Sequence, residues 1–364
     1  MKETISDKQA TCLVIIFVWG STIVIGTGGD AKSDMWLAML LGTAMGMIVS
    51  IMYSRILYDF PEKDIFDISV ILFGKIIGSI VNLIFTLYAL NLSALVINNF
   101  TEFINTLGLP DTPKIVPVLF IIIICIWGVK EGIEVLGRCS EIFIIVLAAA
   151  IIIATVLSIS KLQLDYLRPF MYDGIIPVLR GTFSAFAFPF AETVIFLMLF
   201  SSLKQRNSSL KAYWIGLSIG GVLLAIIAAR NVMFIGSEAL AKNYFPSYIV
   251  ISRISIGTFL ERIETILIVS FLLAGFIKVT CCILAGCKGI TKILGMEDYR
   301  FIVTPICLMV FTFSFIVYNN IIETTDWAPH IYPVYAFSFQ VILPLIIFIA
   351  SEIKMRKVKK KGVR

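Results

Sequence analysis

The sequence predicts an all-α polytopic membrane protein of about ten transmembrane helices, arranged as two inverted repeats of five. Three observations support this. Hydrophobic residues make up 59% of the 364 residues and charged residues only 15%, whereas an average soluble protein carries about 25% charged residues. Ten apolar stretches follow one another along the chain, and most reach the ~20 residues that cross ~30 Å of hydrocarbon. The first and the sixth stretch each contain a helix-breaking motif.

The ten stretches are separated by short connections, and the fourth stretch is the shortest. The longest connection, roughly residues 235–262, has under 30 residues, so no soluble catalytic domain fits between the spans. We therefore predict one transmembrane domain over residues 1–353 and a basic tail over 354–364. The predicted spans cover roughly residues 10–29, 35–58, 76–100, 115–129, 135–159, 180–200, 211–234, 263–287, 301–320 and 332–351.

The distribution of basic residues predicts the orientation of the chain in the membrane. Connections and tails on the side of the N-terminus carry about 20 Lys and Arg residues, and those on the other side carry about 8. Because cytoplasmic loops are enriched in Lys and Arg, we predict that both termini are cytoplasmic. The tail from Lys354 to Arg364 anchors this topology and could contact anionic membrane lipids. So short a tail does not indicate nucleic-acid binding.

The two interrupted spans indicate an internal repeat. The first contains Gly20-Ser21-Thr22, and the sixth contains Pro189, which removes a backbone donor within the helix. They lie five spans apart, so we predict repeats over about 8–160 and 175–353. Because each repeat has an odd number of spans, the two repeats cross the membrane in opposite orientations. Paired interruptions are typical of inverted-repeat transporters, which bind substrate near the midplane of the membrane. Alternatively, Gly20 and Ser21 only let neighbouring helices pack closely.

Glu192 follows Pro189 by three residues and lies at bilayer depth. A carboxylate there is costly, so it is expected to face a partner or a watery cavity. Three roles remain open. Glu192 could hold the ammonium group of a bound solute, take up and release a proton, or form a structural ion pair. Lys278, in the eighth span, has the same need for a partner and is the candidate cation.

Polar side chains in the third span extend the candidate site. Tyr88 and Asn91 lie deep enough in this span to face a cavity. Polar residues also join membrane helices through hydrogen bonds worth ~1 kcal/mol each, and this alternative remains open.

No motif for an enzyme, a cofactor or a metal is visible. The seven cysteines are odd in number and lie in or beside apolar stretches, as buried free thiols do. The only histidine is His330, in a connection. We therefore expect neither catalysis nor a bound cofactor.

Several stretches carry a resemblance to a known family. The chain resembles the B subunits of spore germinant receptors, which are GerB-type members of the amino acid/polyamine/organocation transporter superfamily, over nearly its whole length. The stretches that support the resemblance are Ile5-Ser6-Asp7-Lys8-Gln9, Gly20-Ser21-Thr22, Asp34-Met35-Trp36, Phe186 to Glu192, and Phe259-Leu260-Glu261-Arg262-Ile263-Glu264, the last being the most specific.

The resemblance implies a LeuT-like fold and a small nutrient ligand such as an amino acid. It also implies assembly with an A subunit and a lipoprotein C subunit in the spore inner membrane. By the same analogy, backbone at Gly20, Ser21 and Thr22 and at Ala187, Phe188 and Pro189 would surround the ligand. Binding would shift a conformational equilibrium that the partner subunits detect.

Two other functions are compatible with the same residues. The chain could be an amino-acid permease coupled to protons through Glu192 or Lys278, or a structural subunit whose pocket no longer binds a ligand. The resemblance favours the receptor.

Overall fold

The structure is a computed structural model that describes residues 3–108, 111–203, 207–241, 243–254, 264–318 and 321–362. Over these residues the regular structure is helical, apart from an isolated β-bridge between Ile5 and Leu203. Seven of the described helices are long and apolar enough to cross a membrane: Gly29–Asp59, Ile65–Leu107, Ile133–Lys161, Ile175–Met198, Ser208–Ile235, Glu264–Leu294 and Tyr332–Val358.

Three shorter helices account for the remaining predicted spans: α1 (Asp7–Trp19), α4 (Ile115–Glu131) and α11 (Val303–Ser314). The predicted all-helical fold is confirmed, with about ten apolar spans in the expected order and breaks in the first and the sixth. The other span helices are α2 (Met35–Asp59), α3 (Ile65–Phe103), α5 (Ile133–Ser158), α6 (Ile175–Ala185), α7 (Ser208–Ile235), α10 (Glu264–Leu294), α13 (Tyr332–Phe337) and α14 (Leu343–Gly362). Short helices lie in the connections: α8 (Ser237–Ala241), α9 (Pro246–Ser252) and α12 (Ile321–His330).

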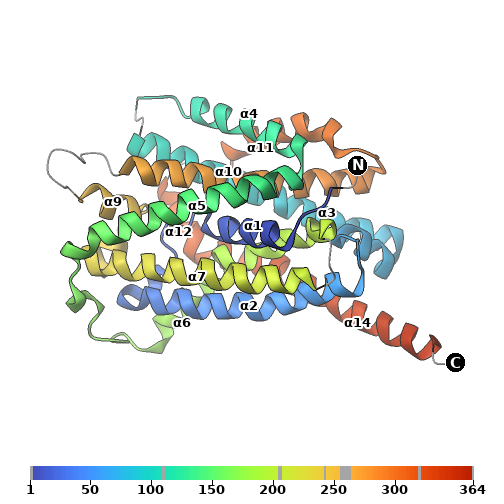
Figure 1. Ribbon diagram of the computed structural model, residues 1–364, viewed down its shortest axis with the longest axis horizontal. Coiled ribbons are helices and arrows are strands. Elements are labelled where there is room, and N and C mark those ends of the chain that lie inside the picture. Colours follow the sequence, from blue (N-terminus) through green and yellow to red (C-terminus); the bar gives the residue numbers. More distant parts are fainter. Residues whose placement is uncertain are drawn as a thin grey trace.

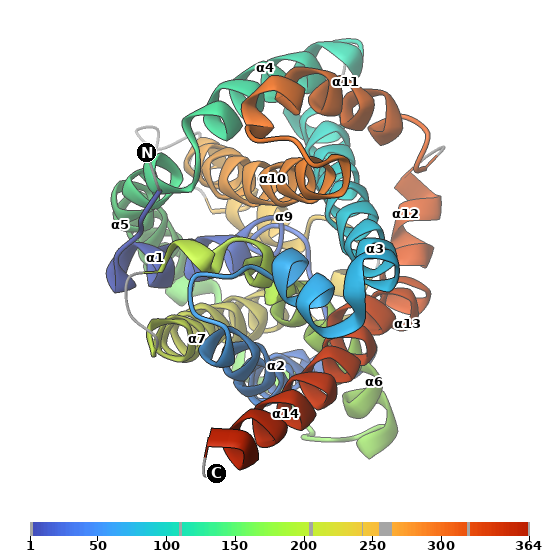
Figure 2. The ribbon, with the colours of Figure 1, turned by 90° about the vertical axis from the view of Figure 1, so that its right-hand side faces the viewer.

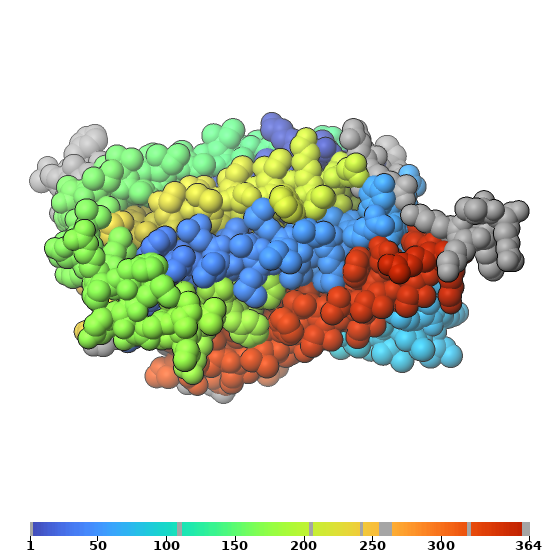
Figure 3. Space-filling view, turned by 90° about the horizontal axis from the view of Figure 1, so that it is seen from below, coloured from blue at the N-terminus to red at the C-terminus, as the bar shows by residue number. Residues whose placement is uncertain are grey.

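The helices run along the long axis of the molecule, and both marked chain ends lie at the same end of the bundle (Figure 1). An end-on view places α1 and α10 inside the bundle, with α4 and α11 paired at its periphery (Figure 2). On the face seen from below, α7, α2 and α14 lie side by side (Figure 3). The most extensive helix packing joins α10 to α3 and α2 to α7.

Burial distinguishes the central span from the helices at the surface. In the most apolar part of the sixth span, Ile175–Met198, 89% of the residues are buried, against 28% in the fifth, Ile133–Lys161. Large apolar side chains such as Ile48 and Ile145 are exposed on the outside of the bundle, as expected for surfaces that contact lipid tails. The broken sixth span is therefore enclosed by the other helices.

Two glycines of α2 bring this helix close to the sixth span. Gly42 and Gly46 are four residues apart, the spacing of a small-residue contact between membrane helices. A methyl group at Gly46 would lie 2.8 Å from Cβ of Phe190, and one at Gly42 would lie 3.0 Å from the backbone nitrogen of Phe186. The contact thus supports the sixth span at its break.

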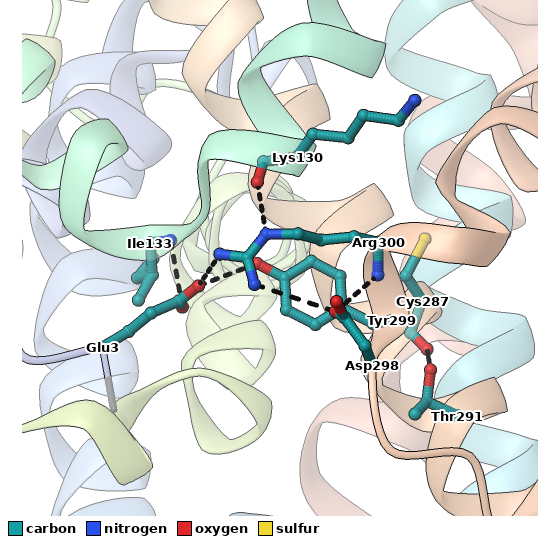
Figure 4. Close-up of polar contacts among 8 residues, drawn as sticks. All are labelled: Glu3, Lys130, Ile133, Cys287, Thr291, Asp298, Tyr299 and Arg300. Atoms are coloured by element: carbon teal, nitrogen blue, oxygen red, sulfur yellow. Dashed lines mark hydrogen bonds and ion pairs between the residues drawn. The ribbon is translucent and has the colours of Figure 1, made fainter. Parts of the chain in front are cut away.

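Glu3, near the N-terminus, makes polar contacts with residues from separate parts of the chain (Figure 4). The Glu3 carboxylate accepts hydrogen bonds from the Tyr299 hydroxyl (2.9 Å), Arg300 Nη2 (3.1 Å) and the Ile133 backbone (3.4 Å). Arg300 Nε also donates to the Lys130 carbonyl at 2.8 Å. The segment therefore connects the junction of α4 and α5 to the connection between α10 and α11.

The structure describes only part of two segments that the sequence analysis singled out, the motif before the eighth span and the basic tail. Phe259 to Ile263 of the most specific motif lie outside the described residues, and Glu264 begins α10. The predicted basic tail continues α14 as a helix as far as Gly362. Within it, Lys354 Nζ donates to the Ile71 carbonyl at 2.8 Å, which holds α14 against the start of α3.

We expect Gly46→Val to destabilise the protein by about 1–3 kcal/mol, because the added side chain overlaps Phe190 in a closely packed contact. The measurement is the thermal unfolding midpoint of the detergent-solubilised protein. Ile48→Val is the matched control on the same helix, since Ile48 is 66% exposed on the lipid-facing side. An unchanged midpoint for Gly46→Val would contradict the close packing of α2 on the sixth span.

Candidate ligand-binding site

The first span breaks where the sequence predicts. α1 ends at Trp19, and Gly20 adopts φ 22° and ψ −118°, a backbone conformation that residues with a Cβ rarely adopt. Ser21 and Thr22 follow in a non-helical turn, and both are buried. Their hydroxyl oxygens have no hydrogen-bond partner in the described part of the chain. The break thus leaves buried polar groups beside the negative end of α1.

The sixth span breaks between α6 and a tightly wound helix, η6 (Ala191–Met198). Phe188 leaves the helical region at φ −135° and ψ 109°, and Pro189 follows it without a backbone donor. Glu192 lies in the first turn of η6, where the positive end of the helix favours a carboxylate.

Lys278 joins the two breaks. Its Nζ lies 2.5 Å from Oε2 of Glu192, and both side chains are fully buried. Its aliphatic chain passes over the first break, since a methyl group at Gly20 would lie 2.5 Å from Lys278 Cδ. The ammonium group also lies 4.7 Å from the centroid of the Phe188 ring, within range of a cation–π interaction. One residue of α10 therefore contacts both interrupted helices.

The Tyr332 hydroxyl, from α13, donates a hydrogen bond to the other carboxylate oxygen of Glu192. It lies 3.4 Å from the Tyr88 hydroxyl of α3. Gln340 Nε2 donates to the Tyr88 hydroxyl (3.0 Å) and to the Ala187 carbonyl (2.8 Å), so it satisfies a backbone group beside the second break. The network links both breaks to α3 and α13.

Asn91, also predicted as a site residue, has a different environment. Its side-chain amide donates to the Tyr335 hydroxyl at 2.7 Å, which joins α3 to α13. This contact agrees with the alternative interpretation, in which Asn91 joins two helices through a hydrogen bond. Asn91 does not line the cavity that reaches Glu192.

A cavity of about 770 Å³ reaches Glu192 from one side. Its wall includes residues of α8, α9 and α12, and α9 lies at the end of the bundle away from both termini (Figure 1). From the bundle interior, Phe188, Glu192 and Tyr332 contribute to the wall. Its volume lies in the range of small-molecule sites in proteins.

The cavity contains only part of the predicted site. Of the predicted residues, Phe188 and Glu192 line it, whereas Gly20, Ser21, Thr22, Tyr88, Asn91, Ala187 and Pro189 do not. Most of these residues lie at the breaks and in the network around Glu192, while the run from Ile25 to Gly29 after the first break forms one wall. Sequence reasoning missed Tyr332 and Gln340, because a tyrosine at the start of a span is a common interfacial residue.

Among the described residues, no group of three or more His, Cys, Asp or Glu side chains is placed to hold a metal ion. The seven cysteines are free thiols. The arrangement can hold a small molecule against a buried carboxylate and aromatic rings.

We expect Glu192→Gln and Lys278→Met each to lower protein abundance and the thermal unfolding midpoint. Breaking a fully buried ion pair from one side costs about 3–5 kcal/mol, because the remaining charge has no counterion. The double variant removes both charges and should recover most of the loss. Lys32→Met, which removes the exposed partner of Asp173, serves as the control. A double variant as unstable as the single variants would contradict a pairwise ion-pair role.

Comparisons with known proteins identify the family of the chain. A family model described as spore germination protein matches residues 4–323. Spore germination protein KB of Bacillus subtilis (strain 168) is 28% identical over 99% of this chain and 98% of its own length. Spore germination protein GerQB of Bacillus cereus is 23% identical over 98% of this chain and 100% of its own length.

Solved structures show the fold. The chain superposes on Mhp1, a nucleobase-cation-symport-1 family transporter with bromovinylhydantoin bound, with a TM-score of 0.74 at 12% identity, covering 94% of this chain and 78% of that one. It superposes on MhsT in complex with L-phenylalanine with a TM-score of 0.67 at 11% identity, covering 96% and 100%. Both have the LeuT fold. The chain therefore belongs to the spore germination protein family, as a GerB-type germinant receptor B subunit built on the LeuT fold.

Proposed function

We propose that the protein binds a small nutrient, such as an amino acid, in the cavity and signals germination from there. The observation that carries this proposal is the cavity itself, which reaches Glu192, the buried partner of Lys278. This pair contacts both interrupted spans, so a ligand that reaches Glu192 acts where the two halves of the fold meet.

The contacts suggest how binding would be converted into a conformational change. A ligand in the cavity meets Phe188, Glu192 and Tyr332. A polar group of the ligand that competes for Glu192 would weaken its bonds to Tyr332 and Lys278, and so change the contacts of α13 and α10 with the sixth span. The ligand shifts the equilibrium only if it binds the two conformations with different affinity.

The remaining parts of the proposal concern the assembly. Germinant receptor A and C subunits would detect the movement, with the B subunit in the spore inner membrane and both termini on the cytoplasmic side. In that orientation the cavity opens away from the cytoplasm, toward nutrients that arrive from outside. Two repeats, over about 8–160 and 175–353, would move relative to one another around the pair, as in transporters with inverted repeats.

A proton-coupled amino-acid permease is the second candidate. The observation that favours it is the buried ion pair itself, because intramembrane carboxylate and lysine side chains mark proton pathways in transporters. Steady accumulation of a radiolabelled nutrient in vesicles that contain the protein would support the permease. Binding without accumulation would support the receptor.

We expect Leu95→Phe to shift the nutrient dose response of germinating spores to about tenfold higher concentration, because Leu95 lines the cavity and a larger side chain reduces its volume. The measurement is germination against nutrient concentration, with the protein level checked by immunoblot.

Leu87→Phe is the matched control for this experiment. It makes the same replacement on the same helix, at a position that is 56% exposed on the outside of the bundle. An unchanged dose response for Leu95→Phe at normal protein level would argue against ligand binding in the cavity.

A further inference from the structure

Arg230 is a buried cation that has no acidic partner within the described residues. It lies in α7, about one and a half turns before the helix ends at Ile235. A basic side chain so close to the end of a span usually extends to the membrane surface, but only 2% of Arg230 is exposed. No ion pair joins it to an aspartate or glutamate of the described chain. Since buried charges are normally paired, the guanidinium group of Arg230 is expected to have a counterion from another source.

The hydrogen bonds of the guanidinium group leave one of its nitrogens available. Nε and Nη2 donate to the side-chain oxygen of Asn231, at 3.2 and 2.8 Å, and Asn231 in turn donates to Ser247 Oγ at 3.0 Å. Nη1 has no acceptor in the described part of the chain. An arginine side chain is always protonated and carries five N–H donors. The neutral amide of Asn231 satisfies two of them and leaves the positive charge uncompensated.

A small cavity lies beside Arg230. It has a volume of about 10 Å³ and a wall formed by α5, α7, α9, α10 and Ile23, just after the first break. Such a volume accommodates about one particle of the size of a water molecule. Apart from Arg230, the only polar side chain among the described residues of the wall is Ser270, whose hydroxyl donates to the Ile266 carbonyl at 2.7 Å. The cavity therefore has room for a single small particle next to one cationic group.

We propose that this cavity binds a single small anion, chloride or a halide of similar size, through Nη1 of Arg230. The anion supplies the missing negative charge and accepts the unused N–H groups of the guanidinium. A water molecule would accept them without neutralising the charge. A carboxylate or phosphate does not suit the cavity, because an oxyanion needs more room and several more donors than the apolar wall provides.

The anion site is separate from the cavity that reaches Glu192, because the two cavities have no lining residue in common within the described chain. Its wall brings α5, α7 and α10 together with α9 and Ile23. A bound anion would hold Arg230 in place among these helices, and so stabilise the packing of the seventh span against the segment after the first break. Anion binding here does not depend on the proposed nutrient ligand.

The test measures the thermal unfolding midpoint of the full chain in nanodiscs of phosphatidylcholine, while sodium chloride replaces sodium gluconate at constant ionic strength. We expect the midpoint to rise by about 2–4 °C by the point where chloride exceeds its dissociation constant about fivefold, because an ion that binds only the folded state stabilises it by mass action. Bromide should act like chloride, and sulfate, which is larger and divalent, should not. Equilibrium dialysis with radioactive chloride should give a single bound ion per chain, above the level of empty nanodiscs.

Two variants and their controls locate the ion. Arg230→Met removes the cation, and Ala150→Val adds two carbon atoms at a buried position in the wall of the cavity, so each should abolish the rise with chloride. Arg253→Met and Ala149→Val make the same replacements at exposed positions and should keep it. Because Ala150→Val retains the guanidinium group, it tests the site even if Arg230→Met does not fold.

A midpoint that does not depend on chloride, or a rise that both Arg230→Met and Ala150→Val retain, would overturn the inference. A rise that sulfate produces equally would also contradict it, because that behaviour indicates a general effect of salt on the protein. The expected result is loss of radioactive chloride from Arg230→Met and its retention by Arg253→Met.

Discussion

The ion pair between Lys278 and Glu192 is the interaction on which the rest of the structure depends. Two opposite charges that are both fully buried stabilise each other, because separating them would leave each buried charge without its counterion. Their positions also suit the two breaks, since Glu192 lies in the first turn of η6 and Lys278 passes beside the end of α1. Interrupted helices and buried charges therefore stabilise each other, in the way that helix ends stabilise ions within membrane transporters.

The two ends of the bundle differ in how they are closed. At the end with the termini, Glu3 binds Tyr299, Arg300 and the backbone of Ile133, which ties together connections from both halves of the chain. At the opposite end a cavity extends inward to Glu192. The cavity therefore reaches Glu192 from the end of the bundle that lies away from the termini.

Much of the fold could be predicted from the sequence, because its signals are local. Hydrophobic length determines a span, and glycine or proline determines where a helix breaks, so the first and sixth spans were identifiable from Gly20 and Pro189. The pairing of Glu192 with Lys278 was one of several alternatives, since they are 86 residues apart and only the fold brings them together. Tyr332 and Gln340 gave no signal, because a tyrosine or glutamine in an apolar stretch does not reveal which helix it faces. The cavity wall after the first break, from Ile25 to Gly29, likewise depends on packing.

The passage of the Lys278 side chain over Gly20 limits the order in which the sequence can change during evolution. A side chain at position 20 would overlap the lysine and would also lie 2.9 Å from the Phe17 carbonyl oxygen, so a shorter residue 278 is one of the conditions for a change at that position. Shortening residue 278 leaves the charge of Glu192 without its partner, so position 192 must become neutral at nearly the same time. Three positions on three different spans thus depend on one another, and a change at one of them is expected to be tolerated only together with changes at the others.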